Sequence, residues 1–190
     1  MGTPTAHCNT FLMNLQKIND EVFVAQDEIV HIGESELVFL KDQARSNTRK
    51  RARICAHKSN NDRLHEMFIA ISSQSYIHPH KHTLKSESFH IVEGVVDVVL
   101  FDDHGEITEI IKLGDSCSGR KFFYRLSESI YHTLLIRSEY LLVHEVTNGP
   151  FSREKTILAG FAPAEAEMVE AAKYMNKVAL RAAMFMESRG

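Results

Sequence analysis

Three histidines lie within five residues of one another in this sequence, in the run His78-Pro79-His80-Lys81-His82. Histidine is the commonest protein ligand for transition metals, and the chain contains 11 of them. Residues two apart on a strand project to the same face, so His80 and His82 can reach one point. Four residues of turn then lead to Glu87, which starts a returning strand and can meet both imidazoles from alongside. This spacing predicts a metal site.

A fourth ligand has to come from elsewhere in the chain. His132 lies in the apolar run 130–134, which follows a polar turn, and a burying sheet would point it inward. Three imidazoles and one carboxylate accept Fe(II), Mn(II), Co(II), Ni(II), Cu(II) or Zn(II). Such a set leaves positions open on an octahedral ion, as catalytic sites do, whereas structural zinc sites are closed, often by thiolates. We therefore predict one divalent transition metal on His80, His82, Glu87 and His132.

Short apolar segments separated by turns fill the middle of the chain, and they must position these ligands. The segments are 67–71, 95–101, 107–113, 122–126, 131–137 and 140–146. Strands at such regular spacing, without helices between them, indicate an antiparallel sandwich or barrel. Gly94 and Gly105 stand where tight turns are needed. We predict an all-β domain over residues 51–151, flanked by an N-terminal helical or extended segment, 1–50, and a C-terminal loop and helix, 152–190.

Helical spacing of apolar residues marks both flanks. Asn9 or Thr10 is suited to cap a first helix, and Ser35 to cap a second. The first helix would carry Phe11, Leu12, Leu15 and Ile18. Pro163 is placed to open the C-terminal helix, whose apolar seam consists of Met168, Ala171, Met175, Val178, Ala182 and Phe185. The seam has two interpretations, packing on the chain's own barrel or a homodimer contact, and we expect a homodimer.

These residues resemble the motifs of the cupin superfamily. Its first motif consists of two histidines separated by one residue, then a glutamate and then a glycine. His80, His82, Glu87 and Gly94 fit this motif. Its second motif supplies one histidine, which His132 matches, although Ser127 and Ser129 stand where the family usually has Pro-x-Gly, and Ile136 where it has Asn. The resemblance implies a cupin barrel (a double-stranded β-helix, or jelly roll) that holds a metal.

Within the cupins, the chain resembles the WbuC family over roughly residues 45–163. The matching segments are 51–57, 64–67, 85–90, 130–134 and 147–151. That family is found with bacterial O-antigen and surface-polysaccharide genes, and its activity is undefined. The resemblance implies a metal-dependent enzyme acting on a sugar or sugar phosphate, of isomerase or epimerase type. A non-haem iron dioxygenase and a non-enzymatic metal- or ligand-binding module are the alternatives.

Further polar residues are candidates for the substrate pocket. His78 shares its strand parity with His80 and His82, and Tyr124 offers a phenol on an aromatic strand. Arg51 and Arg53 alternate on one face and, if that face is inward, can grip a carboxylate or phosphate. One residue of the adjacent pair 144–145 should also face inward, and the pattern does not decide which.

Composition excludes several classes of partner. A net charge of -3 gives no reason to expect nucleic acid. No apolar run approaches the roughly 20 residues that cross a bilayer, and the N-terminus lacks the pattern of a signal peptide. Three widely spaced cysteines, Cys8, Cys55 and Cys117, indicate a reducing compartment. We expect a cytoplasmic protein that binds a small molecule.

Overall fold

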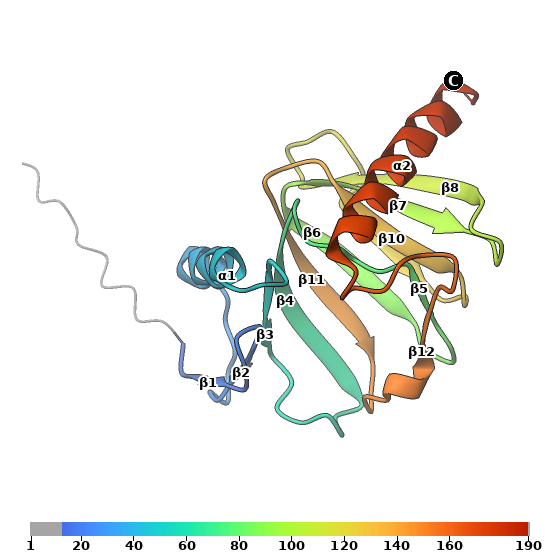
Figure 1. The fold of residues 1–190 in the computed structure, drawn as a ribbon. Coiled ribbons are helices and arrows are strands. Elements are labelled where there is room, and N and C mark those ends of the chain that lie inside the picture. The colour runs from blue at the N-terminus through green and yellow to red at the C-terminus, as the bar shows by residue number, and fades with distance from the viewer. Residues whose placement is uncertain (1–12, 190) are drawn as a thin grey trace, which may run out of the picture.

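Two β-sheets stacked face to face dominate the computed structural model, which describes residues 13–189 (Figure 1). The seven-stranded sheet has the order β1 (Leu15–Lys17), β2 (Val22–Ala25), β3 (Arg51–Cys55), β4 (Leu64–Ser72), β11 (Tyr140–Asn148), β6 (Glu87–Glu93), β9 (Phe123–Leu126). The five-stranded sheet has the order β12 (Thr156–Leu158), β5 (His80–His82), β10 (Tyr131–Ile136), β7 (Val95–Phe101), β8 (Ile107–Gly114). Neighbouring strands run antiparallel, except that β2 pairs with β3 in parallel. A short 3-10 helix, η1 (Arg153–Lys155), precedes β12.

The order of the strands identifies the fold as a jelly roll. From β4 to β11 the chain crosses repeatedly between the sheets, so that β4-β11-β6-β9 faces β5-β10-β7-β8. Each sheet thus interleaves early and late strands of the sequence, as the paired Greek keys of jelly rolls do. Cupins have this architecture, so the fold class predicted from the sequence is confirmed.

Three apolar clusters follow from the alternation of side chains along the strands. The central cluster lies between the sheets and contains Ile69, Ile91, Val98 and Leu134. A second lies outside the larger sheet, where α1 (Glu34–Ser46) contributes Leu40 and Ala44. A third lies outside the smaller sheet and includes residues of α2 (Met168–Glu187). Each sheet therefore has a covered outer face, and the space between the sheets is left for the site.

The N-terminal segment differs from the prediction in its first element. Leu15 and its neighbours form β1, which pairs with β2 as a hairpin, so the helix expected through Leu15 and Ile18 is wrong there. Pairing with β2 overrides the helical spacing, because the strand gains a hydrogen-bonded partner in a sheet that continues into β3. Asn9, Thr10 and the expected start of that helix lie outside the described residues.

The second expected helix is present as α1. It begins after Gly33 instead of at Ser35, because the Gly33 amide donates to the buried Glu36 carboxylate (2.9 Å) and closes the first turn. The first strand pair and this helix join the larger sheet and its outer cluster.

The C-terminal helix begins five residues later than Pro163 predicts. Residues 164–167 form a turn in which the Ala164 amide donates to Glu167 (2.8 Å), and the Tyr76 hydroxyl donates to the Pro163 carbonyl (2.8 Å). α2 then packs against the outer face of β7 and β10, with Val178 and Ala182 fully buried. This packing on its own domain is the first of the two interpretations of the seam, and a dimer stays a prediction. Neither described helix combines the length and apolarity needed to cross a membrane.

Candidate metal centre and its cavity

The four predicted ligands converge at one place between the sheets. His80 and His82 lie on β5, His132 lies opposite His80 on the adjacent β10, and Glu87 is the first residue of β6 in the facing sheet. One donor atom from each side chain falls within 4.8 Å of the other three. The arrangement follows from strand parity, because residues that are two apart on β5 place their side chains on the same face of the sheet, here both imidazoles.

Hydrogen bonds behind the three imidazoles orient them toward a common centre. The Nδ1 atoms of His80 and His132 contact the carbonyls of His78 (2.8 Å) and Ile130 (3.0 Å). Because a carbonyl can only accept, each of these nitrogens must carry a hydrogen. The Nδ1 atom of His82 contacts the Thr156 hydroxyl on β12 at 3.1 Å. The Nε2 atoms are thereby turned to the centre, as in metal sites whose histidines are held by a second hydrogen bond.

The contacts of Glu87 show that the cluster needs a cation. Its carboxylate oxygens lie 3.2 Å from Nε2 of His82 and 3.3 Å from Nε2 of His132. With a hydrogen on Nδ1, a neutral His132 presents a lone pair at Nε2, so two acceptors would face each other. A proton on the imidazole or a divalent ion among the four donors removes this conflict. The donor set therefore fits a transition metal of the predicted kind.

Burial and mutual charge prepare most of these ligands in their metal-binding form. Burial, and next the neighbouring His132, lowers the pKa of His80 to about 4, so this imidazole is neutral at neutral pH. Burial opposes ionisation of Glu87, but His132 and His82 hold its pKa well below the usual range. Burial would lower the pKa of His132, yet the Glu87 carboxylate outweighs it and raises this pKa. At His132 a metal therefore competes with a proton.

Tyr124 lies behind the metal cluster. Its hydroxyl donates to Oε1 of Glu87 (2.9 Å), and its ring packs edge-on against Phe89 in the central apolar cluster. The structure thus places this phenol where it supports a ligand, rather than on the wall of the cavity that the cluster faces. Burial and the Glu87 charge raise its pKa well above the usual value, so the hydroxyl keeps its hydrogen and remains a donor.

A cavity of about 550 Å³ opens beside the cluster, and all four ligands line it. Side chains from both sheets and from segment 151–165 form its walls. His78 is on the wall with its Nε2 atom 3.1 Å from the Ala159 carbonyl. A cavity of this size accommodates a small organic molecule, and the metal cluster forms part of its lining.

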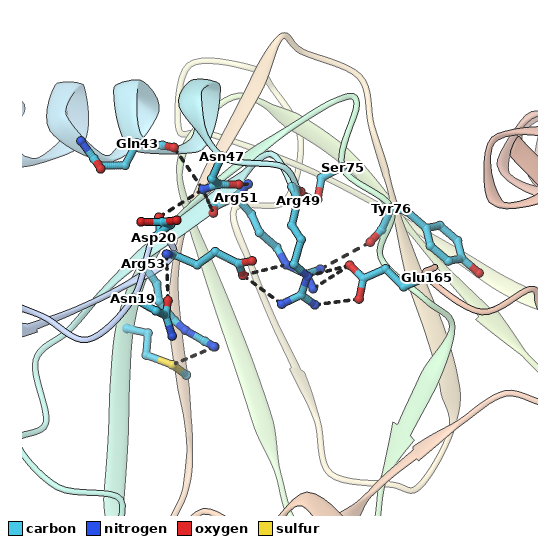
Figure 2. Close-up of polar contacts among 12 residues, drawn as sticks. Asn19, Asp20, Gln43, Asn47, Arg49, Arg51, Arg53, Ser75, Tyr76 and Glu165 are labelled. Carbon is cyan, nitrogen blue, oxygen red and sulfur yellow. Dashed lines mark hydrogen bonds and ion pairs between the residues drawn. The ribbon is translucent and has the colours of Figure 1, made fainter. Parts of the chain in front are cut away.

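Arg51 and Arg53 both line the cavity, but in different surroundings. Figure 2 shows Arg49 and Arg51 converging on the Glu165 carboxylate, while the Arg53 guanidinium lies apart from it. Arg49 forms a two-pronged ion pair with Glu165 (2.8 Å for both bonds), and Arg51 joins it at 3.2 Å. The sequence placed Arg51 and Arg53 on one face of a strand without deciding whether that face is inward, and it held no signal for a partner more than a hundred residues away.

Glu145 is a cavity residue that the sequence could not assign. Of the pair 144–145, Glu145 faces the cavity, while His144 stacks on Phe68 at the outer face. Glu145 pairs with Phe89 in the register and Thr147 pairs with Glu87, so the carboxyl groups of Glu145 and Glu87 are diagonal neighbours. Burial, and next the Glu87 charge, raises the pKa of Glu145 to about 7. This carboxyl group can therefore exist in both protonation states at neutral pH.

Two further histidines contact each other near the edge of the cavity. His57 and His65 stack at 4.0 Å, and Nε2 of the buried His65 has no partner among residues 13–189.

Comparison with known proteins gives partial likenesses. Residues 32–113 match a family model described as a domain of unknown function (DUF6016). No curated protein matches the sequence. Among solved structures, protein SO0799 from Shewanella oneidensis is similar with a TM-score of 0.46 and 15% identity, covering 63% of this chain and 78% of that one.

Two other similar structures are longer proteins. Oxalate decarboxylase from Bacillus subtilis has a TM-score of 0.41 and 17% identity over 52% of this chain. Procruciferin, an 11S globulin from Brassica napus, has a TM-score of 0.38 and 12% identity over 46% of it. The matches cover only 24% and 21% of those chains. The fold assignment rests on the strand order, and membership of the WbuC family stays a prediction.

Proposed function

We propose that this protein is a metal-dependent enzyme whose active site is the cavity beside His80, His82, Glu87 and His132. The observation that carries the proposal is that these four donors line a cavity of about 550 Å³ instead of being enclosed by protein. Structural metal sites are closed by protein ligands, whereas catalytic sites keep a position for water or substrate.

The reaction that we propose is an isomerisation or epimerisation. A bound divalent metal supplies Lewis-acid chemistry, polarising a carbonyl or hydroxyl oxygen of the substrate. Glu145 lies in the same cavity, and its carboxyl group makes no hydrogen bond or ion pair with the residues from 13 to 189, so this group is available. With a pKa of about 7 it can accept a proton from substrate carbon and return one. His80 stays neutral and does not compete for that proton.

The substrate that we propose is a small sugar-derived molecule used in O-antigen or surface-polysaccharide synthesis. Support comes from the resemblance to the WbuC family and from a cavity large enough for one such molecule. The same proposal includes a cytoplasmic location and a homodimer, without nucleic-acid or membrane partners. The free thiols of Cys55 and Cys117 are compatible with a reducing compartment.

Solvent-deuterium exchange tests the proposal without knowledge of the product. Metal-loaded protein is incubated in heavy water with a panel of sugar phosphates and nucleotide sugars, and carbon-bound deuterium is measured by mass spectrometry. We expect incorporation with at least one compound, lost in His132→Ala and retained in His144→Ala, whose side chain lies on the outer face. No exchange or turnover across the panel would contradict an isomerase, and Fe(II)-dependent oxygen uptake would favour the oxygenase instead.

A further inference from the structure

Basic side chains line the cavity in addition to the metal cluster. They are Arg49, Arg51, Arg53, Lys85 and Arg153. Two of them are neutralised by protein carboxylates, because Arg49 and Arg51 share Glu165, and Arg49 also contacts Glu21 at 2.9 Å. This arrangement leaves the positive charge of the other three to be explained.

Arg53, Lys85 and Arg153 have no carboxylate within ion-pair distance in the part of the chain from residue 13 to 189. The Arg53 guanidinium contacts the Met67 sulfur at 4.0 Å. Sulfur is a weak acceptor, and a partly buried guanidinium with five donors is left with unused hydrogen-bonding capacity. A charge removed from water is costly unless it is paired. The cavity wall at Arg53 is therefore suited to an anion that the protein itself does not supply.

The nearby acid does not fill this role. The Glu145 carboxyl group lies in the same cavity but is not within ion-pair distance of Arg53, Lys85 or Arg153.

The register of the larger sheet separates Arg53 from the metal cluster. Arg53 on β3 is opposite Ile69 on β4, which is opposite Val143 on β11, which is opposite Ile91 on β6. Arg53 is thus three strands from β6, roughly 14 Å across the sheet at roughly 4.8 Å per strand. Glu87 lies four residues along β6 from Ile91. A ligand that reaches both ends of the cavity has to be elongated.

Apolar side chains form the wall between these two ends. They are Met67, Ile69, Ile71, Ile77, Phe89 and Leu134. These side chains offer contacts to methylene, methyl or C–H surfaces, and the Glu145 carboxyl group, on β11 between Met67 and Phe89, lies among them as a hydrogen-bonding group. The middle of the ligand should therefore present mainly apolar surface, with a polar group where it meets Glu145.

We propose that Arg53 binds the carboxylate or phosphate of an elongated substrate whose middle contacts the apolar wall. Lys85, two residues before Glu87, and Arg153, three residues before the β12 residue that pairs with His82, add positive charge to the rest of the cavity. The substrate is then a small organic acid or phosphate ester whose other end faces His80, His82, Glu87 and His132. This proposal rests on the proposed function only in taking the cavity as the substrate site.

Anion binding to metal-stripped protein tests the proposal by calorimetry, because no anion can then bind through the metal. The probes are inorganic phosphate, butyl phosphate and hexanoate. We expect Arg53→Gln to weaken phosphate binding at least tenfold, the loss typical of a charge-assisted hydrogen bond. Arg125→Gln is the matched control, because Arg125 is exposed on β9 and is not part of the cavity wall, and it should bind like wild type.

Two further measurements separate the outcomes. Butyl phosphate should bind more tightly than phosphate, by roughly fourfold for each methylene that contacts the apolar wall. Comparing it with hexanoate distinguishes a phosphate ester from a carboxylic acid as the anionic group. If the Arg53→Gln variant does not fold, Arg153→Gln is measured instead, because Arg153 is exposed. It should weaken phosphate binding by less than the tenfold expected for Arg53→Gln.

Equal phosphate binding by wild type, Arg53→Gln and Arg153→Gln, or no binding by wild type, would overturn this proposal. The proposed function would stand in that case, since these measurements involve neither metal nor turnover. A failure of the deuterium-exchange experiment would likewise leave this anion-binding result intact.

Discussion

Replacing Glu145 by glutamine should remove a pH dependence of folding stability that the metal-free protein has because Glu145 is buried in the cavity. Burial and the Glu87 charge raise the pKa of Glu145 from 4.5 to about 7. The folded protein therefore binds a proton that the unfolded chain has released between these two pH values. The stability that this bound proton gives to the folded protein is fully present below the pKa of Glu145 in the unfolded chain. It is lost as the pH rises through the pKa of Glu145 in the folded protein.

The size of the effect follows from the shift. A difference of about 2.5 pKa units corresponds to about 3.5 kcal/mol, since each unit is about 1.4 kcal/mol. Most of this change should fall between about pH 5 and about pH 8. Glu145→Gln keeps the shape of the side chain but cannot titrate, so its stability should exceed that of wild type increasingly as the pH rises.

Urea denaturation of metal-stripped protein, at a series of pH values, measures the difference directly. Glu109→Gln is the control, because Glu109 is exposed on β8, outside the cavity, and forms no ion pair with residues 13–189, so this variant should leave the pH profile unchanged. Parallel profiles for wild type and Glu145→Gln would refute the reasoning, as would a wild type that gains stability relative to this variant with rising pH.

Three other predictions concern the metal centre and the turn at Gly94. Tyr124→Phe removes the hydroxyl that donates to Glu87 (2.9 Å) and should weaken metal binding roughly tenfold in competition with a coloured chelator; an affinity equal to that of Tyr140→Phe would contradict this role. A divalent metal at about 100 times its dissociation constant should stabilise wild type by about 2.7 kcal/mol, measured as a rise in melting temperature that His80→Ala lacks. Gly94→Ala should cost at least about 1–3 kcal/mol in urea denaturation, because Gly94 has a φ of 94° and an added Cβ would collide with the Tyr140 carbonyl oxygen; an unchanged midpoint would contradict it.

Much of the site was visible in the sequence because its geometry is local. His80 and His82 are two residues apart, so strand parity brings both imidazoles to one face, and Glu87 follows after a short turn that leads the chain to the facing sheet. His132 is distant in sequence, but its place in an apolar strand predicted an inward direction. Evenly spaced strands bounded by turns indicated an antiparallel sandwich or barrel, and the resemblance to the cupins implied the jelly roll.

The remaining features depend on pairing between distant segments. Which of His144 and Glu145 faces inward is set by the register of β11 between β4 and β6, and a single residue of slip would exchange them. The same is true of Tyr124, which meets Glu87 only because β9 pairs with β6. Leu15 has helical spacing with its neighbours, yet pairing with Ala25 makes it a strand residue.

Elemental analysis of bound metal tests the four-ligand centre most directly. The protein is stripped, exposed to each divalent transition metal in turn, desalted and measured. We predict about one ion per chain for wild type and for His144→Ala, and loss of that ion in His132→Ala and Glu87→Gln. Wild type that retains none of the metals, or a His132→Ala variant that retains as much as wild type, would contradict the account.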